Sequence, residues 1–279
     1  MADSYRVGLI VPSSNTTMEA EVPGILRRRA EIAPETFTFH SSRVRMLNVT
    51  REELAAMVAD SDRCAIELAD AGVDVMAYAC LVAIMTQGPG YHETSERRLA
   101  EVAAEHGAAV PVVSSAGALV RGVRALGVSR VAVVAPYMKP LTALVVSYLE
   151  DAGIEVVDAV SLEIPRNADV ARHDPMRLPD IAARLRTDDA QAVVLSACVQ
   201  MPSQPAVAIA EERLGLPVLS ASVATAYEIL DRLGLEPVAP GAGALLAGGA
   251  YAAGSGPASV GSPAATQSSL PSAYSSTDV

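Results

Sequence analysis

Short runs of apolar residues alternate with longer amphipathic stretches along most of the chain. The runs are nearly continuous in Val, Ile, Leu and Ala, which is typical of parallel strands covered by helices on both faces. We expect strands at Arg6–Val11, Thr36–Ser42, Asp74–Ala79, Val110–Ser114, Arg130–Ala135, Glu155–Val160, Ala192–Ala197 and Pro217–Ser220. Their alternation with helical stretches predicts an α/β fold with parallel sheets.

One helix carries sequence signals at both ends. Thr50 is a suitable N-cap, and Glu53 three residues later completes the pattern of a capping box. Gly72 is a suitable residue to end this helix. Apolar residues recur at helical spacing between these ends, at Leu54, Met57, Val58, Cys64 and Leu68. The pattern therefore assigns Cys64 to the core.

Three segments recur in the same order in the two halves of the chain. RVGLIVPSSN at 6–15 matches RVAVVAPYMK at 130–139, and DVMAYACLV at 74–82 matches AVVLSACVQ at 192–200. VPVVSSAGALVRGVRALG at 110–127 matches LPVLSASVATAYEILDRLG at 216–234. Collinear matches indicate an internal duplication. We therefore expect two pseudo-symmetric lobes, each a four-stranded parallel sheet flanked by helices.

This duplication suggests a division of the chain. We place an N-terminal lobe at 1–115, a C-terminal lobe at 116–221, and a C-terminal helix that packs back on the lobes at 222–246. Beyond this point the sequence is rich in Gly, Ala, Ser and Pro and lacks an apolar pattern. We predict a disordered tail at 247–279.

Two cysteines occupy equivalent positions in the repeat. Cys80 and Cys198 each follow an apolar strand that ends in a small residue, Ala79 or Ala197. Ligands of open α/β sheets bind outside the carboxyl ends of strands, where backbone N–H groups favour a thiolate. Each cysteine alone is equally well explained as a small buried apolar residue. Their paired placement favours a functional role at a cleft between the lobes.

Several polar residues are candidates for binding an anion. Ser14 and Asn15 follow the first strand and precede a helix, so they suit either an anion site or a helix cap, and both roles are compatible. Tyr137 holds the equivalent place in the second half, where its hydroxyl is suited to a carboxylate or simply to packing. Asn167 lies in a Pro-Arg-Asn loop and is equally consistent with a turn.

Composition narrows the classes of function. Apolar residues make up 51% of the chain, but none of their runs is long enough to span a bilayer, and the acidic start is unlike a signal peptide. We therefore expect a cytoplasmic protein without a membrane partner. The net charge of −11 and the scattered basic residues argue against nucleic acid as a partner. Three cysteines, an odd number, favour reduced thiols over disulfides.

Motifs for metals and nucleotide cofactors are missing from the sequence. The four histidines show no metal-ligand spacing, and no P-loop, no GxGxxG after a strand and no GxSxG elbow occurs. We expect an enzyme that needs no metal and no organic cofactor.

With these residues in place, the chain from about Arg6 to Gly234 resembles the aspartate/glutamate racemase superfamily and, within it, the maleate cis–trans isomerases. The motifs that carry the resemblance are VPSSN, AYACLVA, APY, IPRN and SACVQMPS. Amino-acid racemases of the superfamily usually have Asn-Thr or Thr-Glu/His after their cysteines, whereas Leu81-Val82 and Val199-Gln200 follow here. Arylmalonate decarboxylases also resemble the chain but have Gly in the place of Cys80.

The resemblance implies conversion of maleate, a small dicarboxylate, to fumarate. It implies that Cys80 is the nucleophile and Cys198 the proton donor and acceptor. The substrate-binding groups that it implies are Asn15, Leu81, Val82, Tyr137, Asn167 and Val199. It also implies a homodimer. The alternatives are a racemase of the same two-cysteine superfamily and a non-catalytic module that binds small anions.

Overall fold

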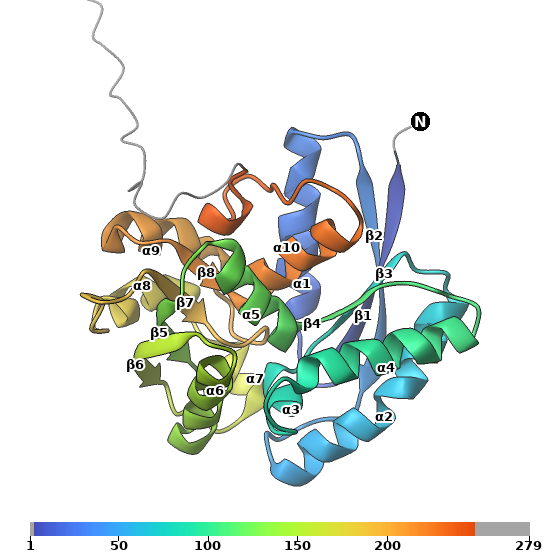
Figure 1. Ribbon diagram of the computed structural model, residues 1–279, viewed down its shortest axis with the longest axis horizontal. Helices are drawn as coiled ribbons and strands as arrows, with labels where there is room; N and C mark the ends of the chain where they lie inside the picture. Colours follow the sequence, from blue (N-terminus) through green and yellow to red (C-terminus); the bar gives the residue numbers. More distant parts are fainter. Residues whose placement is uncertain (1–2, 249–279) are drawn as a thin grey trace, which may run out of the picture.

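The structure, a computed structural model, describes residues 3–248. They form two four-stranded sheets, each made of parallel strands and flanked by helices (Figure 1). The strand order is β2-β1-β3-β4 in the first sheet and β6-β5-β7-β8 in the second. This arrangement confirms the predicted fold class, and every expected strand is present. The strands are β1 (Ser4–Pro12), β2 (Thr36–Val44), β3 (Val75–Tyr78), β4 (Val112–Ser114), β5 (Arg130–Ala135), β6 (Glu155–Ser161), β7 (Ala192–Ser196) and β8 (Val218–Ser220).

The two sheets repeat one topology. β1 and β5 take the second place in their sheets, β3 and β7 the third, and β4 and β8 the outer edge. All paired strands are parallel. The segments matched in the sequence therefore occupy equivalent positions in space, as the duplication predicts. We call the unit around β1–β4 the N-terminal lobe and the unit around β5–β8 the C-terminal lobe.

Burial differs between the strands of each sheet. β3, β7, the stretch of β1 from Val7 to Pro12 and all of β5 after Arg130 are buried, as expected for strands covered on both faces. The edge strand β2 instead alternates, with Phe37 and Val44 buried and Thr36 and Thr38 exposed. β6, the corresponding edge strand of the second sheet, is half-buried along most of its length. The other two edge strands, β4 and β8, are wholly buried, so the expectation that both faces are covered fails only at β2 and β6.

Helices connect the strands and cover the sheets. They are α1 (Met18–Arg27), α2 (Arg51–Asp70), α3 (Leu81–Met85), α4 (Tyr91–Glu105), α5 (Ser115–Ala125), α6 (Lys139–Asp151), α7 (Asn167–Val170), α8 (Leu178–Ala182), α9 (Val207–Leu214) and α10 (Ala221–Arg232). Short 3-10 segments lie at Arg28–Glu31, Pro175–Arg177, Gln204–Ala206 and Ala244–Leu246. α5 and α10, the helices that follow the matched strands β4 and β8, pack against each other.

The start of α2 follows the predicted signals with one difference. The Thr50 hydroxyl accepts a hydrogen bond from the Glu53 N–H, 3.3 Å away, as an N-cap should. The Glu53 carboxylate does not return to Thr50. It accepts from the N–H groups of Leu47 and Asn48, at 2.6 and 2.8 Å. Only half of the capping box therefore forms, and Glu53 instead fixes the segment between β2 and α2.

The structure has few features that correspond to the proposed boundaries between the lobes, the C-terminal helix and the tail. Within 222–246, which was predicted to be helical, the structure has α10 and the 3-10 segment at Ala244–Leu246. Most of the predicted tail, residues 249–279, lies outside the described residues. The boundaries of the lobes remain predictions. No helix within residues 3–248 is long and apolar enough to cross a membrane.

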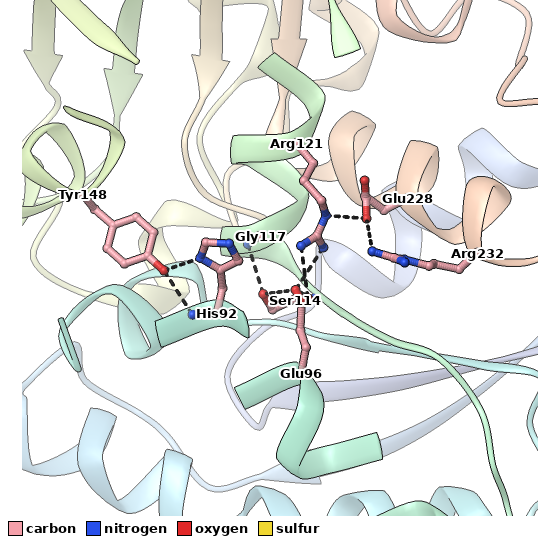
Figure 2. Close-up of polar contacts among 8 residues, drawn as sticks. All are labelled: His92, Glu96, Ser114, Gly117, Arg121, Tyr148, Glu228 and Arg232. Carbon is pink, nitrogen blue, oxygen red and sulfur yellow. Dashed lines mark hydrogen bonds and ion pairs between the residues drawn. The ribbon is translucent and has the colours of Figure 1, made fainter. Parts of the chain in front are cut away.

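A partly buried polar network joins the two lobes (Figure 2). Arg121 on α5 donates to Glu228 on α10 at 2.6 Å and to Glu96 on α4 at 3.0 and 3.1 Å. Beside it, the Tyr148 hydroxyl on α6 accepts from the His92 N–H at 3.1 Å and lies 2.6 Å from the His92 ring nitrogen Nδ1. These contacts tie α4 of the N-terminal lobe to α6 and α10 of the C-terminal lobe.

Candidate active site

Cys80 lies directly beyond β3, at the point where the chain turns into α3. Its backbone is in the left-handed region, with φ of 90° and ψ of 81°. Cys80 and Glu163 are the non-glycine residues with positive φ in the described part of the chain. Such a conformation costs a non-glycine residue about 1–3 kcal/mol and persists where the surrounding structure enforces it. Strain of this kind often marks a functional position.

Cys198 lies beyond β7 and has an ordinary backbone conformation. Its carbonyl oxygen accepts a hydrogen bond from the Ser196 hydroxyl at 2.8 Å. Its sulfur accepts from the N–H of Gln200 at 3.4 Å. The exposed fractions of Cys198 and Cys80 are 6% and 8%, so both thiols are nearly shielded from solvent.

Both cysteines line one small cavity. Its walls are formed by Pro12, Asn15, Met46, Val49, Cys80, Leu81, Val82, Tyr137, Asn167, Cys198, Val199 and Gln200. Only about 20 Å³ of its space can hold the centre of a water molecule, which is room for about one water. A dicarboxylate therefore requires the walls to move apart. None of the lining side chains carries a charge.

Both cysteines and all six substrate-binding residues that the resemblance implies line this cavity, although they come from both lobes, whereas Ser14 does not line it. Four lining residues were not selected: Pro12, Met46, Val49 and Gln200. Pro12 and Gln200 stood within the quoted motifs but had no assigned role. Met46 and Val49 lie between β2 and α2, where no motif indicated a site. The Cys80 thiol donates to the Met46 thioether sulfur at 3.9 Å, so Met46 packs directly on the first cysteine.

The Asn15 amide is oriented by the start of α1. Its oxygen Oδ1 accepts hydrogen bonds from the N–H groups of Thr17 and Met18, both at 3.0 Å. The two expected roles of Asn15 are therefore compatible, because the contacts at the helix start use the oxygen and leave the NH₂ group free to donate to a ligand. Asn167 reaches across from the other lobe, and its Nδ2 donates to the Ser14 hydroxyl at 2.7 Å.

Tyr137 lies against the second cysteine. Its hydroxyl donates to the carbonyl oxygen of Ala197 at 3.2 Å, and its exposed fraction is 6%. Burial raises the pKa of Tyr137 well above its ordinary value, and the two neighbouring thiols add to the effect. Tyr137 therefore stays protonated at neutral pH and can act as a hydrogen-bond donor.

Burial also raises the pKa values of both thiols. The pKa of Cys80 rises to about 12, chiefly because the thiolate is removed from water, while the N–H groups of Ala83 and Val82 oppose the rise. Proximity to Cys198 raises it further. Burial likewise raises the pKa of Cys198, against the effect of hydrogen bonds from Tyr137 and from backbone N–H groups. Charge on the Cys198 sulfur thus disfavours charge on the Cys80 sulfur, so the site opposes two thiolates at the same time.

Comparisons with known proteins agree with this geometry. Residues 7–246 match the family model described as arylmalonate decarboxylase. A maleate isomerase from Geobacillus stearothermophilus is 61% identical over 249 residues, which cover 89% of this chain and 99% of the relative.

Two solved structures are similar over nearly their whole lengths. A cysteine-to-alanine variant of the maleate isomerase from Pseudomonas putida S16, with maleate, superposes with a TM-score of 0.88 at 58% identity and covers 90% of this chain and 100% of that one. A cysteine-to-serine variant of the Nocardia farcinica maleate cis–trans isomerase carries a covalently bound succinylcysteine intermediate. It superposes with a TM-score of 0.84 at 48% identity and covers 87% of this chain and 98% of that one.

Proposed function

Because this chain belongs to the maleate isomerases within the arylmalonate decarboxylase family, we propose that it converts maleate to fumarate through a covalent adduct on one of its cysteines. The observation that carries the proposal is the pair of thiols in one small, uncharged cavity between the lobes. A thiolate that adds to the substrate replaces the high barrier to rotation about a double bond by two lower barriers.

Cys80 and Cys198 take separate roles in the proposed reaction. The Cys80 thiolate forms a C–S bond with one alkene carbon of maleate, and the π electrons move to the neighbouring carbon. The Cys198 thiol gives its proton to that carbon and becomes a thiolate. The result is a succinyl group joined to Cys80 through the C–S bond, and its central C–C bond is now single and rotates freely.

The second half of the reaction reverses the first. After rotation, the Cys198 thiolate removes a proton from the carbon that it faces. The electrons of that C–H bond form the new double bond, the C–S bond breaks, and its electron pair returns to Cys80. Fumarate leaves, and both sulfurs regain their starting charges. Because charge on Cys198 raises the pKa of Cys80, the site disfavours two thiolates at once, and the proposed steps never require more than one.

Neutral donors stabilise the charge that develops next to the carbanion. We assign this task to the amides of Asn15 and Asn167 and to the Tyr137 hydroxyl, which lie around the cavity. The backbone N–H groups of Leu81, Val82 and Val199 serve the same purpose. Fixed donors in a site without bulk water stabilise an oxyanion far more than they would in solution.

The residues that line the cavity also argue against two related activities, amino-acid racemisation and decarboxylation. An amino-acid racemase must bind an ammonium group, and no acidic side chain lines this cavity. A decarboxylase of the family has glycine where Cys80 stands here. Glycine adopts a left-handed φ more easily than cysteine does. Cysteine therefore occupies position 80 at a cost in backbone strain.

A direct assay tests the proposal. Purified, reduced protein incubated with maleate alone should form fumarate, detected by proton NMR, and protein alkylated beforehand with iodoacetamide should not. A folded and reduced preparation that leaves maleate unchanged would contradict the proposed function.

We also propose that the protein works in the cytoplasm as a homodimer. Its three cysteines are unpaired in the structure, and the proposed reaction needs both site thiols reduced, which suits a reducing compartment. Cell fractionation and analytical ultracentrifugation test the two parts separately. Recovery outside the cytoplasm would contradict the first, and a monomer at micromolar concentration would contradict the second.

A further inference from the structure

Gln200 lies two residues after Cys198, at the seam between the lobes, and 2% of its surface is exposed. It lines the cavity, yet its side chain makes its hydrogen bonds to backbone groups of Asn167, which also lines the cavity, and of Ser14 and Thr16, which flank Asn15. Those bonds reach segments more than 180 residues away in the sequence, as well as the loop that carries Asn167.

The Gln200 amide holds the chain on both sides of Asn15. Its oxygen Oε1 accepts from the N–H of Thr16 at 3.1 Å, and its Nε2 donates to the carbonyl oxygen of Ser14 at 2.9 Å. Asn15 stands between these two anchored residues. Its peptide groups are therefore fixed in place from the opposite lobe.

The second hydrogen of Nε2 fixes the other ligand-binding amide. It donates to the carbonyl oxygen of Asn167 at 3.0 Å. The Asn167 side chain in turn donates to the Ser14 hydroxyl, which closes a ring of hydrogen bonds through Gln200, Asn167 and Ser14. Both N–H donors of the Gln200 amide are then used.

We propose that Gln200 is the positioning residue of this active site, which sets Asn15 and Asn167 at the spacing that two substrate carboxylates require. This inference rests on the proposed function. Contact with these three backbone groups needs two hydrogen-bond donors and one acceptor at the end of one side chain. A primary amide provides all three. A displacement of about 1 Å in such groups lowers catalysis by about 10²-fold.

Kinetics of Gln200→Met and Gln200→Glu with maleate test the proposal. Methionine keeps the length of the side chain and removes all three bonds. Glutamate keeps the acceptor for Thr16 but turns both donor contacts into repulsion between oxygens. For each variant we expect kcat/KM to fall by about 10²-fold, with a KM at least about tenfold higher. A purely structural defect reduces the folded fraction and so lowers apparent kcat without raising KM.

Gln204→Met is the matched control. Gln204 lies in the same loop, and its side chain also donates to a backbone carbonyl, that of Gly241 at 3.1 Å, but it lines no part of the cavity. We expect its KM and kcat to match those of the wild type. A KM within threefold of the wild type in folded Gln200 variants would overturn the proposal.

If the Gln200 variants do not fold, the Ser14→Ala variant tests the ring of hydrogen bonds instead. It removes only the hydroxyl that accepts from Asn167, and Ser14 is half-buried, so folding should survive. A KM raised about threefold or more would support the ring, and an unchanged KM would overturn it. A wild-type protein that forms no fumarate would instead remove the proposed function, and this inference with it.

Discussion

Cys80 and Cys198 stand at equivalent places in the two lobes, but their surroundings differ. Cys80 has a left-handed backbone, packs against Met46 and leads into the wholly buried helix α3. Cys198 has an ordinary backbone, leads into an irregular loop, and its sulfur accepts a hydrogen bond from Gln200. Backbone N–H groups lie near both sulfurs, but Cys80 otherwise packs against a thioether, whereas Cys198 also faces the Tyr137 hydroxyl.

This difference suggests how one repeated position came to serve two tasks. A sulfur in soft, apolar surroundings suits attack on carbon, because few hydrogen bonds must break when it reacts. A sulfur with fixed donors suits proton transfer, because the donors stabilise the thiolate that remains. The roles assigned to the two cysteines therefore have a physical basis that the sequence repeat alone does not provide.

Removal of the first thiol should have the largest effect. Cys80→Ala should lower kcat by about 10⁴-fold or more, because the covalent path is lost altogether. Fumarate formation followed by NMR measures this. Cys64→Ala is the control, since Cys64 is buried in α2 and does not line the cavity, and its rate should be close to that of the wild type. Comparable losses in both variants would contradict the assignment.

Removal of the second thiol should have a different consequence. Cys198→Ala should lower kcat by about 10²- to 10⁴-fold, the usual contribution of a general acid or base. Because Cys80 remains, a small amount of adduct should form with water as the slower proton source, and mass spectrometry of the digested protein should find a succinyl group on the peptide that contains Cys80. An adduct on the peptide with residue 198 in the Cys80→Ala variant would show that the roles are reversed.

The pH dependence should reflect the raised pKa of Cys80. Since the thiolate attacks and its pKa of about 12 lies far above neutrality, raising the pH increases the reactive fraction. The value of kcat/KM should climb about tenfold per pH unit between about pH 6 and 9. Alkylation of Cys80 by iodoacetamide, followed by peptide mass spectrometry, should rise in parallel. A flat profile would mean that Cys80 is already ionised in the free enzyme.

The backbone contrast predicts a small change in stability. Cys80→Gly should be more stable than Cys80→Ala by about 1 kcal/mol, because glycine adopts a left-handed φ without strain. At residue 198 the order should reverse, with Cys198→Ala the more stable. Thermal unfolding of the four variants measures both differences, and each should shift Tm by about 2–4 °C. The same order at both sites would argue against strain at Cys80.

The sequence predicted the strands well because parallel strands in the interior of a sheet are almost wholly apolar. The predictions are wrong where structure depends on features other than an apolar pattern. At the sheet edge, β2 alternates between buried and exposed residues, and it extends beyond the predicted end at Ser42 through the exposed Arg43 to the buried Val44. The cap of α2 was predicted correctly from Thr50, whereas the partners of Glu53 depend on how the preceding chain folds back.

The candidate site was predicted through its motifs and its repeat. Met46 and Val49 were not predicted as site residues, because the segment that contains them is not one of the segments repeated in the two halves of the sequence. Gln200 was visible in the sequence, but its role depends on contacts with Ser14 and Thr16, which only the folded lobes bring near. The positive φ of Cys80 was equally hidden, because the residue types that usually reveal such a backbone are glycine and asparagine.

The uncharged cavity has a consequence for how substrate arrives. The protein carries a net charge of −11, and maleate is a dianion at neutral pH. Long-range forces therefore oppose the encounter, and the donors that hold the substrate act only at hydrogen-bond distance. Added salt screens the repulsion over roughly 10 Å at 0.1 M. Capture should accordingly become faster as ionic strength rises, the reverse of enzymes that draw in their substrates by opposite charge.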